Sequence, residues 1–462
     1  MLATWQNWRQ KSRYREVSRV CIPLVMGMAA TTVMEFTDRI FLSHYSVNAI
    51  SAVVPAGVSA FLILCFLGGI AGYNTVFIAQ YHGAGRPEKI GITLWQGLFF
   101  TFFSGGILLG IAFFVTEPLF TLVGHSPEIR LLENHYFKIL CQGGILHVAI
   151  QALSGFFTGR GMTRPVMLAN IVGMVINIPL NYALINGVWG MPELGIQGAA
   201  LATVVSWAVV VLCLGLPVFS SRFRQEFQLM ETMRLDWVIM QRLLRYGVPG
   251  ALQFSLDIFA FTFFILIVGR MGIIPLAASN IVISISSLAF MPALGFSFGM
   301  SSLTGQALGR GRPDEARSAA WSGIHILLLY TVPLGVLFVF APEFIISIFM
   351  NRGDMGGEYD AILAMSISLL KLVAMYILLD VFYMIFAAVL KGAGDTRFLL
   401  CAISGATLCV MLIPLFTGIN YFGMDIYMAW GCIVLFIATL SGMISWRYHG
   451  GKWERMLVIE KG

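Results

Sequence analysis

Charged residues are scarce in this chain. Only 11% of its 462 residues are Asp, Glu, Lys or Arg, against about 25% in soluble domains, and the mean hydropathy is +0.83. This composition excludes an ordinary soluble domain. Apolar segments recur that are long enough to cross a hydrocarbon core of about 30 Å as α-helices. They lack the alternation of a membrane β-barrel. We therefore predict an all-α integral membrane protein, since backbone amides in lipid must be satisfied within each segment.

Several functional motifs are also missing. The seven cysteines lie in apolar stretches without a CxxC pair or a Cys/His ligand spacing, so we expect no disulfide or metal chemistry from them. No GxxxxGK[ST] sequence is present, which argues against ATP hydrolysis by this chain. We expect neither an enzyme nor a bound cofactor. The basic, aromatic stretch 1–20 lacks a short apolar core with a cleavage site, and we interpret it as a retained interfacial segment.

Apolar windows separated by Gly, Pro and charge clusters predict twelve membrane spans. Their approximate ranges are 17–43, 50–80, 91–115, 131–158, 165–186, 197–219, 245–268, 276–308, 317–341, 361–390, 398–418 and 427–447. An even number of spans places both termini on the same side of the membrane.

The distribution of positive charge predicts which side that is. The net charge is +6, and all but six of the 29 Lys and Arg residues lie in the termini or in the even-numbered loops. We attribute this excess to membrane orientation rather than to nucleic-acid binding, and predict cytoplasmic termini by the positive-inside rule. The six exceptions are Arg39, Arg130, Lys138, Arg270, Arg352 and Lys371.

The chain contains an internal repeat of six spans. "QYHGAGRPEK" after the second span is matched by "QALGRGRPDE" after the eighth, with Gln80 and Gln306 at an offset of 226 residues. "GRGMTR" after the fourth span is matched by "GAGDTR" after the tenth, at an offset of 233. For these glycine pieces, a helix stop with a tight turn is the simpler interpretation.

The repeat predicts two pseudo-symmetric six-helix lobes around a central cavity. Because each copy has an even number of spans, both copies cross the membrane in the same direction. The predicted boundaries are an N-terminal lobe at 1–219, a cytoplasmic linker at 220–244 and a C-terminal lobe at 245–462. This architecture is typical of a secondary transporter; a channel with the same duplication is the less favoured alternative.

An ionised side chain in mid-span costs about 2.5–3.5 kcal/mol on insertion scales and often serves function. Asp380 is the best candidate, because it lies near the middle of the tenth span in "YILLDVFYM". Tyr376 precedes it by one helical turn, and we expect its hydroxyl to donate a hydrogen bond to the carboxylate. A buried aspartate neutralised by a structural partner is the alternative.

The offset of 233 aligns His147 with Asp380. An imidazole and a carboxylate facing one cavity could share protons near neutral pH, although a lone helical histidine is more often structural. Asp257 in the seventh span is the second aspartate candidate, with Gln253 one turn earlier and Ser255 nearby in sequence.

Asp38 in the first span is the third aspartate candidate, with Glu35 and Arg39 beside it in sequence. Asn177 and Asn181 follow one side of the fifth span at helical spacing. These two amides can line a cavity, but interhelical hydrogen bonding is their more common role.

Taken together, the paired loops and the twelve spans resemble the MATE family of multidrug and toxic-compound extrusion transporters. The resemblance covers nearly the whole chain. The major facilitator superfamily also has twelve spans in two lobes, but "HGAGRPEK" fits its loop after the second span poorly. MATE proteins exchange cytoplasmic, often cationic and amphipathic compounds for Na⁺ or H⁺ moving inward.

The resemblance also implies site residues. Asp38 matches the first-span aspartate of the family's "VDT" pattern, written "TDR" here, and Tyr376 and Asp380 match the Tyr and Asp of the NorM-like branch that contribute to its cation site. That branch has a seventh-span Glu, which aligns with Ser255, so the carboxylate is displaced to Asp257. Na⁺ at Asp380 and Asp257 is therefore possible, and the choice between Na⁺ and H⁺ stays open.

We predict a cation-coupled antiporter of a bacterial inner membrane that works by alternating access. Asp380, Asp257, Asp38 and Tyr376 are the expected coupling residues. Its expected partners are a small-molecule substrate, either multiple drugs or one secondary metabolite, and membrane lipid, and we expect a monomer. A lipid-linked precursor flippase would instead have an arginine-rich cavity, and a structural or receptor-like membrane protein would not need Asp380.

Overall fold

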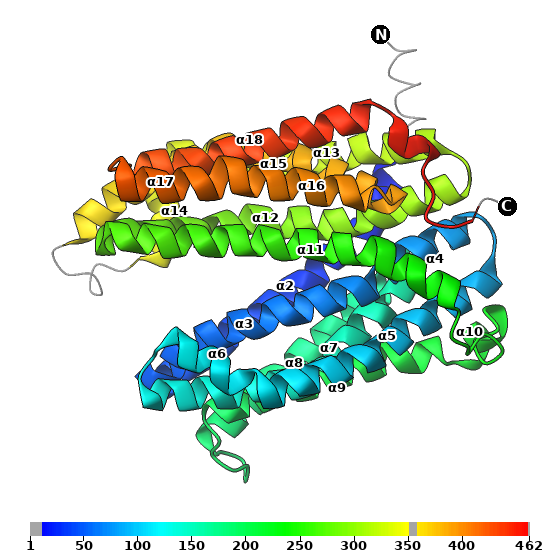
Figure 1. The fold of residues 1–462 in the computed structure, drawn as a ribbon, viewed down its shortest axis with the longest axis horizontal. Coiled ribbons are helices and arrows are strands. Elements are labelled where there is room, and N and C mark those ends of the chain that lie inside the picture. Colours follow the sequence, from blue (N-terminus) through cyan, green and yellow to red (C-terminus); the bar gives the residue numbers. More distant parts are fainter. Residues whose placement is uncertain (1–11, 351–357, 461–462) are drawn as a thin grey trace. The chain divides into compact units, whose positions relative to one another are not determined.

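The computed structural model describes residues 12–350 and 358–460, and in these ranges the chain is helical, without a strand (Figure 1). Twelve helices are long and apolar enough to cross a membrane, which confirms the predicted all-α class and the twelve spans. They are α2 (Tyr14–Tyr45), α3 with α4 (Val47–Gly72, Asn74–Gly83), α5 (Pro87–Phe114), α7 (Pro127–Thr158), α8 (Arg164–Asn186), α9 (Ile196–Val218), α11 (Trp237–Val268), α12 (Ile273–Gly309), α13 (Pro313–Phe340), α15 (Tyr359–Ala393), α16 with α17 (Thr396–Ala406, Ile413–Tyr421) and α18 (Ile426–His449).

Shorter helices accompany the spans. α6 (Thr116–Val123), α10 (Ser221–Glu226) and α14 (Pro342–Phe349) lie between spans, η1 (Gly269–Met271) ends the seventh span, and η4 (Lys452–Arg455) follows the last. α6 and α14 are separated by the same offset of 226 residues that relates the two loops, and each follows the third span of its copy. The sequence repeat is therefore also a repeat of elements.

The glycine-containing loops of the repeat are tight turns. Gly85 and Gly311 have φ values of 69° and 71°, and Gly161 and Gly394 have φ values of 73° and 95°. Only glycine adopts this left-handed conformation without steric cost. Pro87 and Pro313 then begin the next helices, where a missing N–H costs no hydrogen bond. The helix-stop interpretation of these loops is confirmed.

The eleventh span is interrupted by a π-helical segment. α16 and α17 are joined by η3 (Thr407–Leu412), directly before Pro414. A proline has no N–H and its ring clashes with the preceding turn. The wider π turn accommodates this defect without breaking the span.

Contacts divide the chain into two compact units. Of the described residues, unit 1 contains 12–21, 252–308 and 312–456, and unit 2 contains 22–251, 309–311 and 457–460. The predicted lobes, 1–219 and 245–462, differ from these units mainly at the starts of α2 and α11 and at 457–460. The lobe boundaries were predicted from the sequence repeat, and the contact-based units do not test them, so they stay a prediction.

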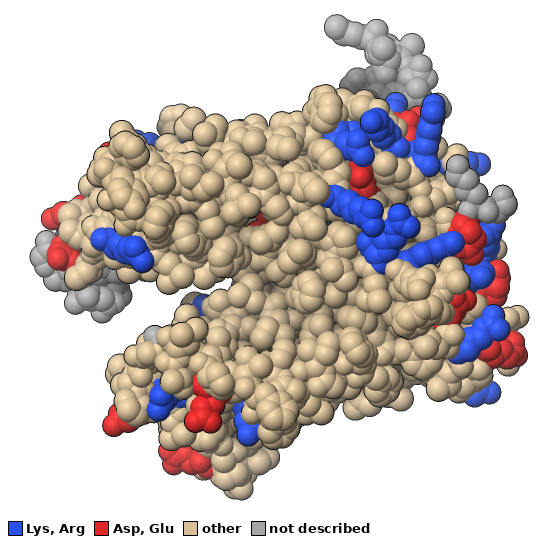
Figure 2. All heavy atoms as spheres, in the orientation of Figure 1, with Lys and Arg blue, Asp and Glu red and all other residues tan. Residues whose placement is uncertain are grey.

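Positive charge concentrates at one end of the helices in each unit, which we call the basic end. On the face shown in Figure 2, Lys and Arg lie over the start of α16 and the end of α18 in unit 1, and over the start of α11 in unit 2. The middles of these helices carry little charge. The basic end contains Arg86, Arg160, Arg242, Arg397 and Arg447.

In unit 2 the connection between α9 and α11 packs closely on α5. The indole of Trp95 donates to the carbonyl of Leu229 over 2.7 Å. The side chain of Gln96 donates to the carbonyl of Arg234 and accepts from the amide of Asp236. The predicted linker is therefore an ordered part of unit 2.

Arg160 fixes the first part of this connection. Its guanidinium lies 3.9 Å from the ring centroid of Phe156, 4.6 Å from that of Phe223 and 4.8 Å from that of Phe227. Burial lowers the pKa of Arg160 to about 10, so the side chain remains charged at neutral pH. Cation–π attraction of this kind holds α10 against the end of α7.

Asn74 fills a site where three helices of unit 2 meet. It is fully buried and donates to the carbonyl of Ala152. A Cβ at Gly155 would lie 1.8 Å from the Asn74 amide oxygen, and one at Gly97 would lie 2.7 Å from its nitrogen. Glycine at both positions lets α5 and α7 approach this amide.

Gly155→Ala should therefore destabilise the protein by about 1–3 kcal/mol, the usual cost of overpacking a core. Thermal unfolding in detergent measures the change. Gly106→Ala on α5 is the matched control, because its Cβ would meet no atom within 4 Å. An equal loss of stability in both variants would contradict the packing described here.

Candidate functional site

The residues singled out in the sequence lie in both units. Unit 2 contains Asp38, Glu35, His147, Asn177 and Asn181, and unit 1 contains Gln253, Ser255, Asp257, Tyr376 and Asp380. Each unit brings some of its own candidates together, and the two groups differ in chemistry.

Asp38 is the centre of the group in unit 2. It lies on α2 and is 6% exposed. Its Oδ1 accepts a short hydrogen bond from Nδ2 of Asn181 on α8, and its Oδ2 lies 3.4 Å from Oγ1 of Thr203 on α9. Three helices therefore supply one carboxylate, one amide and one hydroxyl to a buried polar cluster.

Asn177 extends this cluster by one turn of α8. It is fully buried, and within the described residues neither its Oδ1 nor its Nδ2 has a hydrogen-bond partner. Oδ1 of Asn181 is likewise buried and unpartnered. A buried polar group without a partner costs about 1–3 kcal/mol, so these orphan amide atoms indicate that the cluster is completed by a ligand or by water.

Glu35 and His147 are not part of this hydrogen-bonded cluster. Glu35 is exposed, and it interacts with Asp38 only through its charge. His147 packs edge-on against Trp207, with ring centroids 5.2 Å apart, and lies beside Gly68. The structure places His147 in unit 2 and Asp380 in unit 1, so proton sharing between them stays a prediction.

Asp257 of α11 anchors the group in unit 1. Its Oδ2 accepts a hydrogen bond of 3.3 Å from the hydroxyl of Tyr383 on α15. Gln253, one turn earlier on α11, approaches the same hydroxyl, and its own Oε1 is buried and unpartnered among the described residues. Ser255 lies between them in sequence, two positions from either residue, and so points to another side of the helix.

Asp380 adds a second carboxylate to this group. It interacts electrostatically with Asp257 and with Tyr383. Two neighbouring carboxylates repel each other when both are ionised, and this repulsion costs free energy. A proton or a metal cation between them relieves that repulsion.

The predicted hydrogen bond from Tyr376 to Asp380 is wrong. Tyr376 is buried, and its hydroxyl approaches Ser286 on α12, although it still senses the charge of Asp380. The tyrosine side chain is long, so its hydroxyl extends beyond a carboxylate one turn away and reaches the neighbouring helix. The tyrosine that contacts an aspartate is Tyr383 instead.

Two residues of these groups were missed by sequence reasoning. Thr203 is a lone hydroxyl in the apolar run "GAALATVVSW", and nothing in its own helix marks it. Tyr383 lies within "YILLDVFYM", three positions after Asp380. Its position one helical turn after Asp380 could have marked it as a candidate. Its hydrogen-bond partner, however, is Asp257 on another span.

The side chains of both groups offer oxygen ligands. No cluster of three or more His, Cys, Asp or Glu side chains occurs in the part of the chain that the structure describes. The available ligands are carboxylate, amide and hydroxyl oxygens, which prefer hard cations. A carboxylate can equally take up a proton in their place.

Comparisons with known proteins agree with this architecture. The family model MatE matches residues 23–183 and 249–415, one match in each half of the repeat. The chain is similar to a probable multidrug resistance protein NorM of Thermotoga maritima, at 27% identity over 99% of this chain and 97% of that protein. It is also 27% identical to the multidrug resistance protein MdtK of Yersinia enterocolitica, over 83% of this chain and 82% of that protein.

Solved structures show the same fold. An outward-facing multidrug resistance MATE transporter of the MOP superfamily superposes with a TM-score of 0.85, at 22% identity and covering 95% of this chain and 96% of that one. The eukaryotic MATE transporter AtDTX14 gives a TM-score of 0.83 at 17% identity, with 97% of both chains covered.

The two asparagines of α8 should differ in their effect on stability. Asn181→Ala removes the amide that donates to the buried Asp38 carboxylate, and should cost about 1–3 kcal/mol. Asn177→Ala removes an amide without a protein partner, and should change the unfolding temperature in detergent far less. The reverse order would contradict the hydrogen-bond pattern described above.

Proposed function

Because the chain belongs to the MatE family of membrane transporters, we propose that it is a cation-coupled antiporter. It exports small amphipathic compounds in exchange for Na⁺ or H⁺. The observation that carries this proposal is the buried cluster around Asp38, in which Asn181 donates to the carboxylate while its own Oδ1, and the Oδ1 of Asn177 one turn away, have no partner among the described residues. A cation at Asp38 can supply the missing partner of these amide oxygens.

Charge neutralisation explains how cation binding can drive transport. An ionised carboxylate in a membrane protein is stable only where polar groups or a cation compensate it. Binding of Na⁺ or H⁺ at Asp38 changes which conformation has the lowest free energy. Coupling arises because the two conformations differ in affinity for the cation and for the substrate.

The carboxylates of unit 1 serve as a second cation-binding group. Asp257 and Asp380 interact electrostatically, and Tyr383 holds Asp257 by a hydrogen bond. A negatively charged pair of this kind attracts either a coupling cation or a cationic substrate. The two units thereby divide the work between a single-carboxylate site and a paired one.

Orientation and substrate follow from charge and from the relatives. We place the basic end in the cytoplasm by the positive-inside rule, and the protein in a bacterial inner membrane, since two similar proteins belong to bacteria. Both relatives are named multidrug resistance proteins, and the mid-span carboxylates favour cationic amphipathic substrates. The proposed functional unit is the monomer in lipid.

Asp38→Asn should abolish coupling while preserving shape. In proteoliposomes with an imposed Na⁺ or H⁺ gradient, efflux of a fluorescent cationic dye should fall by about 5- to 150-fold, the range of a typical coupling free energy. Whichever gradient drives efflux in the unmodified protein identifies the coupling cation.

Glu117→Gln is the control for Asp38→Asn, because Glu117 is an exposed carboxylate on the short helix α6. Its efflux rate should equal that of the unmodified protein. If the unmodified protein transports no tested compound under either gradient, the antiporter proposal fails. If Asp38→Asn transports at full rate, Asp38 is not the coupling residue.

Asp380→Asn tests the second group. It removes one of two interacting carboxylates, and should reduce gradient-driven efflux by about 5- to 150-fold on the same grounds. Tyr376→Phe is its companion, since the hydroxyl of Tyr376 contacts Ser286 rather than Asp380. We expect it to retain most of the efflux. A strong loss with Tyr376→Phe and none with Asp380→Asn would contradict this assignment.

A further inference from the structure

A short segment near the C-terminal end of the chain is tied to unit 2 at the basic end. This segment, residues 457–460, is called the strap here. Val458 and Ile459 are 3% and 7% exposed and belong to the hydrophobic core of unit 2. Their backbone amides both donate to Oε1 of Gln80, at 2.9 Å and 3.4 Å. The strap is therefore held by its backbone as well as by its apolar side chains.

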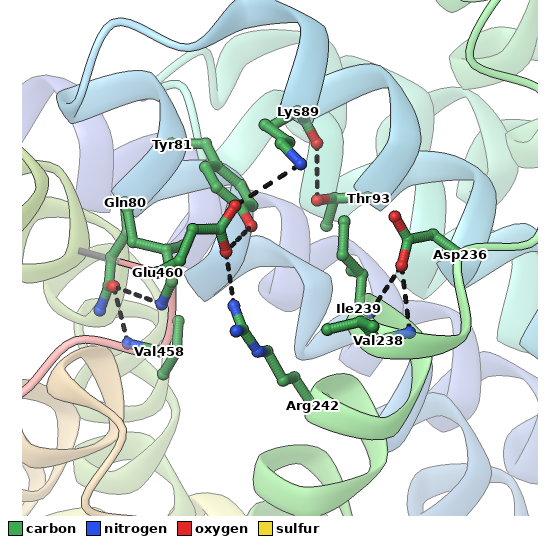
Figure 3. Close-up of polar contacts among 11 residues, drawn as sticks. Gln80, Tyr81, Lys89, Thr93, Asp236, Val238, Ile239, Arg242, Val458 and Glu460 are labelled. Atoms are coloured by element: carbon green, nitrogen blue, oxygen red, sulfur yellow. Dashed lines mark hydrogen bonds and ion pairs between the residues drawn. The ribbon is translucent and has the colours of Figure 1, made fainter. Parts of the chain in front are cut away.

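Glu460 closes the strap with a cluster of charges (Figure 3). Its carboxylate lies 2.5 Å from Arg242 of α11 and 3.6 Å from Lys89 of α5, and it accepts a 3.0 Å hydrogen bond from the Tyr81 hydroxyl of α4. Burial raises the pKa of Glu460, but bonds from its own backbone, Tyr81 and Arg242 together with the charge of Lys89 outweigh burial and lower the pKa. One ionised carboxylate thus joins two cations on two helices.

The other half of the repeat has the same cluster with its charges inverted. The offset of 226 residues relates Arg242 to Glu16 and Lys89 to Glu315. In unit 1, Arg13 lies 2.5 Å from Glu16 and 2.8 Å from Glu315, so one cation joins two carboxylates. Each cluster binds the start of the first helix of one copy to the third-span helix of the other copy: α2 to α13, and α11 to α5.

α11 connects the strap to the cation-binding group of unit 1. Residues 237–251 of this helix belong to unit 2, and residues 252–268, which include Asp257, belong to unit 1. Without Glu460, the charges of Lys89 and Arg242 would repel each other. Through Glu460 the strap ties Arg242 of α11 to Lys89 of α5, in addition to the direct packing of Gly247 of α11 beside Ile70 of α3.

We propose that the strap is a latch that fixes the first half of α11 in the conformation described here, and that its release moves the second half of the helix, where Asp257 lies. The role of Asp257 in transport rests on the proposed function. The contacts that form the latch lie at the basic end, and its effect on residues 252–268 can be measured without transport.

Hydrogen exchange of the purified full-length protein tests the latch. In Glu460→Gln, the amides of Val458 and Ile459 should exchange at least about tenfold faster, because charge-assisted hydrogen bonds are lost. Exchange should also rise in a peptide covering 252–268. Glu454→Gln is the matched control, since Glu454 pairs with Arg317 in unit 1 just before the strap. It should leave the amides of Val458 and Ile459 unchanged.

Charge inversion provides a rescue. Lys89→Glu with Arg242→Glu places three carboxylates together and should open the latch. Adding Glu460→Arg recreates the arrangement of Arg13 with Glu16 and Glu315, and should return exchange to within about twofold of the unmodified protein, because the opposite charges are again paired. Failure of this rescue in a variant with an unchanged unfolding temperature overturns the latch, and so does an unchanged exchange rate in Glu460→Gln.

Hydrogen exchange in residues 252–268 distinguishes a latch, whose release affects the second half of α11, from a clamp that holds only the strap. If only the strap exchanges faster and 252–268 does not respond, the strap is a clamp and the proposal is overturned. Dye efflux is measured on the same variants, and Glu460→Gln should change its rate at least about threefold, a modest population shift. A protein that transports nothing fails the antiporter proposal, whereas the exchange measurements still decide the latch.

Discussion

The cost of placing a polar group in hydrocarbon governs this molecule. Backbone amides are satisfied inside helices, so the only polar groups left at depth are side chains, and each must have a partner. The protein meets this condition for Asp38 through two neighbouring helices, and for Asp257 through Tyr383. Among the described residues it leaves several buried polar atoms without a protein partner, and those of Asn177, Asn181 and Gln253 lie in or beside the two carboxylate groups. A buried polar atom without a partner carries a free-energy cost, so these atoms favour a bound cation or water as the missing partner.

The two halves of the chain share a backbone plan but have diverged in chemistry. Both copies have the same turn, at Gly85 and at Gly311, followed by a proline that begins the next helix. The turns are alike because the same tight helix connection requires a left-handed glycine in each copy. The polar groups obey no such demand. One copy uses a carboxylate with amides, and the other uses two carboxylates with a tyrosine. A duplicated scaffold can therefore hold two different groups of polar side chains on the same helical plan.

The sequence was sufficient for the spans, the repeat and the turns, because these depend on composition and on local geometry. It was also sufficient to identify Asp38, Asp257 and Asp380, since a charge in an apolar run is visible without any partner. The partners were not predictable. Nothing in the sequence around Thr203 distinguishes it from other helical threonines, because its contact with Asp38 depends on how α9 packs beside α2. The expected hydrogen bond from Tyr376 to Asp380 was based on spacing along the helix, which does not take the length of the tyrosine side chain into account. Contacts between helices decide such roles, and one sequence contains little information about them.

The location of the ion pairs explains why the molecule can be rigid and still change conformation. Pairs at the basic end are partly exposed, as at Glu460 with Arg242 and Lys89, so water can solvate these charges when a pair separates. The carboxylates within the spans have no such substitute. The first helices of both copies belong to one unit at their start and to the other unit beyond it. Partly exposed ion pairs therefore hold the beginnings of these helices, and the mid-span carboxylates Asp38 and Asp257 lie further along them, where water is not available to solvate a charge.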